Sequence, residues 1–115
     1  MMMKKTDMDD RQITLNEVLN DGTRIYAYPD PQTGFLLSYG YSAYLLSLVE
    51  GLVFIATFSR MMQMPVISFT ESGLERLRTA GILSFEWNGK YHTASSPHLL
   101  SEDGYRSWTE ELRGF

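Results

Sequence analysis

The sequence feature that constrains the fold most is an apolar run over residues 42–58, SAYLLSLVEGLVFIATF. Such a run has to be buried, either in a bilayer or in the core of a protein. A transmembrane helix needs about 20 apolar residues, and this run is shorter, with Glu50 and Gly51 at its centre, where a charge is costly. We therefore expect one long buried core helix and no insertion into a membrane.

Apolar residues would surround most of the circumference of a helix over residues 42–58, so several neighbours would have to cover it. The chain's own hairpins could do this, or a second copy of the chain. A homodimer through residues 42–58 is therefore one expectation.

The length of the chain limits its organisation. Its 115 residues suit one core, and no internal repeat, linker or low-complexity tract divides them. We expect a single domain over residues 1–115, with residues 1–12 as a disordered polar tail. The chain has no cysteine, and no apolar stretch follows Lys4 and Lys5. These features favour a cytoplasmic protein without disulfides.

Local signals predict an α+β fold in which two β-hairpins pack with one long apolar helix and two or three shorter amphipathic helices. A capping box at residues 14–17 predicts a helix that uses Leu15, Val18 and Leu19 as its apolar residues. A further helix should begin at Ser68 or Thr70 and end at Gly81, and the last should begin at Ser101 and dock by Tyr105, Trp108 and Leu112.

Two hairpins are expected. The first joins strands at about residues 23–28 and 35–39 through a loop rich in proline and glycine, with Tyr28 opposite Phe35. The second joins strands at 82–87 and 90–94 through Asn88 and Gly89, a pair typical of a two-residue turn with both residues at positive φ.

Tyrosines gather in the first hairpin and just after it. Period-two alternation places aromatic residues and one arginine on the same face of this hairpin. Core packing explains part of this composition, but rings beside an arginine are also typical of protein-binding hot spots. Our candidate partner-binding residues are Arg24, Tyr26, Tyr28, Phe35, Tyr39 and Tyr41.

No catalytic or metal-binding pattern stands out. His92 and His98 are too few ligands for a zinc site, and the glycines form no phosphate-binding loop. We expect a non-enzymatic protein without a cofactor. Three methionines at positions 61, 62 and 64 are interpreted as core filling at the end of a helix.

Residues 53–94 resemble a winged helix-turn-helix. A short helix at 53–64 would come first, a recognition helix would end in the phrase Leu77-Arg-Thr-Ala-Gly-Ile82, and the hairpin around Asn88 would form the wing. This resemblance implies a DNA-binding transcriptional regulator, in which Arg76, Arg78 and Lys90 would face the DNA.

The net charge of −4 opposes general attraction to nucleic acid. In size, acidity and lack of motifs the chain is similar to small phage-type inhibitors of bacterial defence complexes, such as anti-CRISPR proteins. Acidic surfaces suit such a role, because they can occupy basic channels that hold nucleic acid. The leading hypothesis is a small acidic inhibitor or adaptor that docks on a protein partner, and the winged-helix regulator is the alternative.

Overall fold

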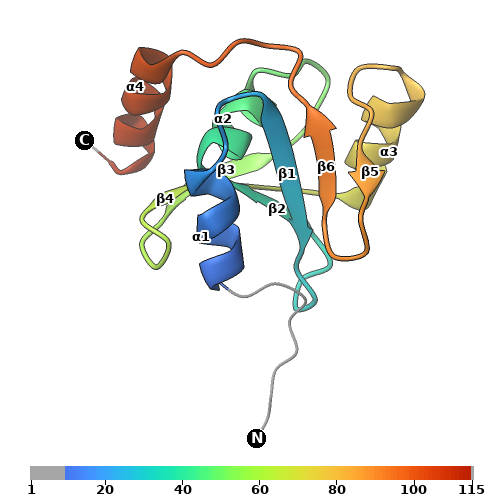
Figure 1. Cartoon of the computed structure of the whole chain (residues 1–115), viewed down its shortest axis with the longest axis horizontal. Coiled ribbons are helices and arrows are strands. Elements are labelled where there is room, and N and C mark those ends of the chain that lie inside the picture. Colours follow the sequence, from blue (N-terminus) through green and yellow to red (C-terminus); the bar gives the residue numbers. More distant parts are fainter. Residues whose placement is uncertain (1–9, 115) are drawn as a thin grey trace, which may run out of the picture.

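One antiparallel sheet of six strands organises the structure, in the order β3-β4-β2-β1-β6-β5 (Figure 1). The structure is a computed structural model and describes residues 10–114. The strands are β1 (Arg24–Pro29), β2 (Leu36–Tyr39), β3 (Ile55–Ser59), β4 (Met64–Phe69), β5 (Glu86–Trp87) and β6 (His92–Ser95). The helices are α1 (Asp10–Val18), α2 (Gly40–Ser47), α3 (Glu71–Thr79) and α4 (Glu102–Leu112).

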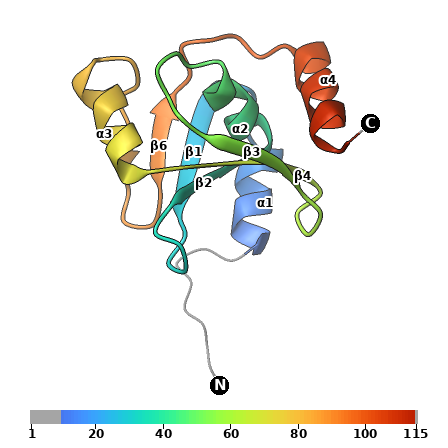
Figure 2. The ribbon, with the colours of Figure 1, turned by 180° about the vertical axis from the view of Figure 1, so that it is seen from behind.

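The two faces of the sheet carry different helices, as Figures 1 and 2 show from opposite sides. On one face, alternate strand residues such as Ile25 and Leu36 are fully buried against α2 and α3, in the main core. On the other face, Tyr28 packs against Ile13 of α1. Period-two alternation separates these two sets of side chains. The expected α+β class is confirmed.

The first hairpin forms where the sequence predicts it, with a register shifted by two residues. Tyr28 pairs with Leu37 and not with Phe35. A shift of two leaves every side chain on its expected face, whereas a shift of one would have exchanged the faces. The predicted aromatic face therefore exists, on the side of the sheet that α1 covers.

The prediction of one long helix over residues 42–58 is wrong. Helix α2 ends at Ser47, the chain turns through Gly51 at φ 87°, and β3 begins at Ile55. Gly51 adopts the left-handed conformation that favours glycine, and exposure then alternates along β3. The run is therefore apolar because its helix and its strand are both partly buried. The helix on which the expected homodimer depended does not form.

Helix α1 begins earlier than the sequence predicts. It starts at Asp10, so Thr14 lies within the helix and does not cap it. The tail predicted over residues 1–12 is too long, because residues 10–12 are helical, and its remainder, residues 1–9, lies outside the described residues.

Two helix starts follow from capping. The side chain of Thr70 accepts a hydrogen bond from the backbone N–H of Gly73 at 3.0 Å, so Thr70 and not Ser68 caps α3. The side chain of Ser101 accepts one from the backbone N–H of Gly104 at 3.0 Å, as predicted for α4. The ring of Tyr105 on α4 then packs against Tyr41, with ring centroids 4.9 Å apart.

The second hairpin exists but its turn differs from the prediction. Trp87 pairs with His92, so four residues form the loop, and Gly89 has a positive φ of 101° whereas Asn88 does not. The side chain of Asn88 accepts hydrogen bonds of 2.9 Å from the backbone N–H groups of Lys90 and Tyr91. This side-chain turn replaces the two-residue turn, because asparagine readily bonds to backbone two residues ahead.

The prediction of a helix at residues 53–64 is also wrong. This helix was the first element of the winged-helix resemblance. Strand β3 and the loop to β4 occupy this segment. The later order, α3 followed by the β5–β6 hairpin, agrees with the expectation. Over residues 10–114, no helix is both long enough and apolar enough to cross a membrane.

Candidate functional site

The side of helix α1 that packs against the protein is not the apolar side that the sequence predicts. Its buried residues are Ile13 and Glu17, four positions apart and therefore on one side of the helix. The residues predicted to be its apolar contacts are exposed: Leu15 by 50%, Val18 by 72% and Leu19, just after the helix, by 72%. A buried carboxylate thus faces inward while three aliphatic side chains face outward.

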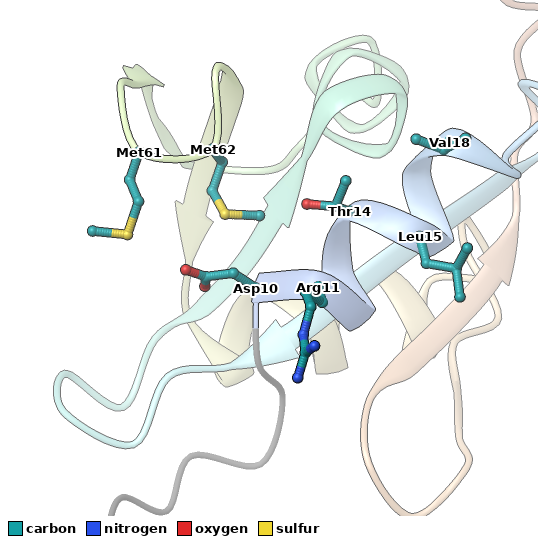
Figure 3. Close-up of a pocket in the computed structure, with 7 residues that line it drawn as sticks. All are labelled: Asp10, Arg11, Thr14, Leu15, Val18, Met61 and Met62. Carbon is teal, nitrogen blue, oxygen red and sulfur yellow. The ribbon is translucent and has the colours of Figure 1, made fainter.

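A groove lies beside this outward side of α1. It has a volume of about 400 Å³ and separates α1 from the loop between β3 and β4, as Figure 3 shows. Leu15 and Val18 line it from the helix, and Met61 and Met62 line it from the loop. Asp10, Arg11 and Thr14 complete the lining. The groove is therefore mainly apolar, with charged groups at one end.

The methionine loop is held in place by its own hydrogen bonds. The hydroxyl of Ser59 accepts from the N–H of Met62 at 3.1 Å, and the carbonyl of Ser59 accepts from the N–H of Gln63 at 2.8 Å. Gln63 has a φ of 58°, which closes the turn. Met62 packs under α1, whereas Met61 is 82% exposed. The interpretation of these methionines as core filling at a helix end is wrong for Met61.

The sheet beyond α1 adds apolar surface on the same face. Tyr39 pairs with Val66, which pairs with Thr57, so these three side chains share the face that α1 partly covers. Ile55 lies on this face two residues from Thr57 and is 64% exposed. Strand β3 is the edge of the sheet and contains no charged residue or proline. Such a strand is open to pairing with another chain.

The predicted partner-binding residues divide into two groups. Tyr26, Tyr28 and Tyr39 belong to a cluster that supports α1, and Tyr28 is 1% exposed. Its hydroxyl accepts a hydrogen bond of 3.0 Å from Asn16 of α1. Phe35 is 41% exposed, on the β1–β2 loop. The tyrosines therefore hold the docking helix, while Phe35 remains accessible.

Arg24 and Tyr41, the other predicted binding residues, are bonded within the protein. The guanidinium of Arg24 donates to the hydroxyls of Ser95 and Thr93 at 2.8 Å each. The hydroxyl of Tyr41 donates to the carboxylate of Glu102 on α4 at 2.9 Å. This acceptor raises the pKa of Tyr41. The structure therefore does not bring all six predicted residues together on one open surface.

The buried carboxylate of Glu17 accepts hydrogen bonds from the start of α2. Its Oε2 accepts from the hydroxyl of Ser42 at 2.6 Å, and its Oε1 accepts from the backbone N–H of Ser42 at 3.2 Å and from Asn20 at 3.4 Å. Burial raises the pKa of Glu17 to about 7, against the opposing effect of these bonds. All these donors are neutral, so no cation among residues 10–114 compensates the charge.

The residues that would face DNA lie at the other end of the sheet. Arg78 forms an ion pair with Glu75 at 2.6 Å and donates to the carbonyl of Phe85 at 3.0 Å. Arg76 is exposed on α3, and Lys90 is exposed in the β5–β6 loop. One of the three cations is therefore partly neutralised, and Glu71 at the start of α3 adds negative charge.

The two histidines do not form a site. The ring of His92 lies near those of Phe85 and Trp87. Its Nδ1 is buried and has no hydrogen-bond partner in the described part of the chain, and burial lowers the pKa of His92. His98 is exposed. Within residues 10–114 no group of three or more histidine or acidic residues could hold a metal ion.

Neither the groove nor the burial of Glu17 was predicted from the sequence. The available signal was the outward apolar side of the first helix, which the capping box led us to treat as its buried side. Comparison of the chain with protein-family models, with curated proteins and with solved structures finds no match.

Proposed function

We propose that this protein is a non-enzymatic docking protein that binds a protein partner along the outward side of α1 and the loop between β3 and β4. The observation that carries the proposal is the reversed orientation of α1, which exposes Leu15, Val18 and Leu19 although a carboxylate is buried beneath them. Exposing aliphatic side chains while burying a charge is unfavourable for a helix that serves only stability. Contiguous exposed apolar surface is typical of interaction sites.

The surface suits a protein more than a nucleic acid. The groove is lined by leucine, valine and methionine, and flexible thioethers adapt to the side chains of a partner. Its charged groups are one acid and one base, Asp10 and Arg11, so it offers no net positive charge to phosphates. An apolar side of a helix or strand of a partner protein is the occupant that matches these features.

The net charge of −4 supports a more specific role as a small acidic inhibitor or adaptor. A protein of negative net charge attracts partners with basic surfaces, and this attraction speeds their association. Machinery that handles nucleic acid in bacteria has such surfaces, which makes it the first class of partner to test.

The test compares capture of partners by matched variants. The groove variant is the double substitution Leu15→Glu and Val18→Glu, which places two charges in the groove. The control is Leu99→Glu, which places a charge at a residue that is 93% exposed and does not line the groove. Wild type and Leu99→Glu should capture the same protein from a bacterial lysate, and the groove variant should lose it. Equal capture by all three would contradict the proposal.

A DNA titration separates the alternative function. Fluorescence anisotropy is measured with DNA duplexes of random sequence and with duplexes from the region upstream of the gene. Wild type should show negligible binding to both at physiological salt. Salt-sensitive binding that is lost in Arg76→Glu and Arg78→Glu would instead support the winged-helix regulator.

A further inference from the structure

Glu17 forms part of the wall of a second cavity, shallow and open to solvent, of about 230 Å³, where α1, the start of α2, the β3–β4 hairpin and α4 meet. The other walls include the side chains of Tyr41, Tyr105 and Met64. At about 30 Å³ of liquid volume per water molecule, the space equals roughly eight waters. It is separate from the groove, although Val18 lines both.

The carboxylate in this cavity has no counter-ion within the described chain. The two ion pairs found over residues 10–114 join Arg78 to Glu75 and Arg106 to Asp103. Glu17 is 8% exposed and accepts hydrogen bonds only from neutral donors. A buried carboxylate is usually paired with a cation, because neutral donors compensate its lost hydration only in part. A bound cation would complete this arrangement.

The remaining walls favour an organic cation. The rings of Tyr41 and Tyr105 meet edge to face at an angle of 85°, and ring faces attract ammonium groups. The thioether of Met64 provides a polarisable surface for an alkyl chain. Glu102, which accepts a hydrogen bond from the hydroxyl of Tyr41, adds a second carboxylate nearby. The negative charge and the rings therefore attract the same kind of ligand.

Gly40 lets the backbone at the start of α2 lie close to both the carboxylate of Glu17 and the sulfur of Met64. A Cβ at this position would lie 3.2 Å from the sulfur of Met64 and 3.4 Å from Oε1 of Glu17. Both contacts are tight, so a larger residue at this position would have to displace Met64 or the carboxylate. The φ of Gly40, 59°, also favours glycine.

We propose that this cavity binds a primary ammonium group on an alkyl chain, with the ammonium against the carboxylate of Glu17 and the chain along Met64 and the tyrosine rings. A primary ammonium can donate hydrogen bonds to the carboxylate, which a quaternary ammonium cannot. The group comes either from a free alkylamine or from a lysine side chain of a docked protein; only the lysine source rests on the proposed docking function.

Solution NMR of the full chain tests this proposal with three probes at matched ionic strength. They are n-butylammonium, Nα-acetyl-lysine methylamide and the uncharged Nα-acetyl-norleucine methylamide. The first two should shift the amide signals of Gly40, Tyr41 and Ser42 with saturation, and the third should not. Saturation should also lower the pKa of Glu17, followed by the ¹³C signal of its carboxyl, by about one unit or more.

Two variants identify the groups responsible. Glu17→Gln keeps the size of the side chain and should weaken binding of n-butylammonium at least about tenfold, because the amide carries no negative charge to attract the ammonium group. Tyr105→Leu should weaken it several-fold, and Tyr105→Phe should restore it, because the ring face is retained. Equal binding by Glu17→Gln, equal shifts with the norleucine probe or an unchanged pKa would each overturn the proposal.

The probes also separate the two sources of the ammonium group. Binding of both charged probes supports a lysine side chain, and binding of n-butylammonium alone supports a free amine. The single variant Leu15→Glu, without Val18→Glu, changes a residue that lines the groove and does not line the cavity. If Leu15→Glu and wild type both bind n-butylammonium while wild type captures no partner, or captures it no better than the groove variant, the docking function is contradicted and the ammonium site stands.

Discussion

The hydroxyl of Ser42 donates a hydrogen bond of 2.6 Å to Oε2 of Glu17 and thereby joins α1 to the first turn of α2. Tyr39, at the N-cap position of α2, provides no side-chain cap. Glu17 therefore caps α2 from another helix, where its charge also interacts favourably with the helix dipole. This contact fixes the orientation of α1, and so the side of α1 that is exposed.

The first prediction concerns pH. The pKa of Glu17 is about 7 in the folded protein and 4.5 as its ordinary value. Because the folded value is higher, the folded state holds a proton that the unfolded state has released between these values. The stability that Glu17 contributes is fully present below pH 4.5 and is lost as the pH rises to about 7, by about 3 kcal/mol in total.

Urea unfolding of wild type and Glu17→Gln between about pH 4 and pH 8 measures this effect. The titratable groups that interact with Glu17 are Tyr26, Tyr28 and Tyr105, and their pKa values are raised above the ordinary tyrosine value, so they do not titrate in this range. The free energy of unfolding of wild type should therefore fall relative to that of Glu17→Gln as the pH rises. Parallel stability curves would show that Glu17 is not buried as described.

The second prediction tests the orientation of α1. Ile13→Ala should lower the free energy of unfolding by about 2 kcal/mol or more, because Ile13 is 6% exposed and its removal leaves a cavity beside Tyr28. Val18→Ala should change it by no more than about 0.5 kcal/mol, because Val18 is 72% exposed. Chemical denaturation measures both. The opposite ranking would mean that α1 packs by its aliphatic side.

The third prediction concerns the turn of the β5–β6 hairpin. Gly89→Ala should destabilise the protein by about 1 kcal/mol, because φ is 101° and a Cβ there would touch nothing else within 4 Å. Asn88→Ala should have a similar effect, since it removes the acceptor for two backbone N–H groups. Thermal denaturation with the exposed Ser84→Ala as control checks both, and an unchanged melting temperature would refute this turn geometry.

The features that sequence could predict depend on neighbours along the chain. Thr70 and Ser101 cap helices through N–H groups three residues ahead, so a short motif is enough. The strands of the first hairpin follow from alternation and a turn-rich loop, which also lie within a short window. The predicted faces of these strands are correct although the predicted register is wrong by two residues, because side chains alternate with a period of two.

The features that sequence could not predict depend on distant partners. Glu17 is buried because Ser42, 25 residues away, supplies two donors for its carboxylate. The run over residues 42–58 forms a helix and then a strand because Ile55–Ser59 can pair with Met64–Phe69. Periodicity alone does not separate a buried helix from a buried strand in a short apolar run.

The last prediction concerns the docking of α4. A Cβ at Gly104 would collide with the hydroxyl of Tyr44 on α2. In an isolated helix, alanine would be more favourable than glycine by about 1 kcal/mol. In this protein, Gly104→Ala should therefore keep α4 helical but displace it from α2, because the hydroxyl and the methyl group cannot share the same space.

Fluorescence of Trp108 measures this displacement, since its ring lies 5.6 Å from that of Tyr44 and is partly buried. Trp87→Phe removes the other tryptophan, which is 50% exposed. In that background, Gly104→Ala should shift the emission to longer wavelength, and adding Tyr44→Phe, which removes the colliding hydroxyl, should reverse the shift. An unchanged spectrum in Gly104→Ala would show that α4 does not pack on Tyr44 through its glycine.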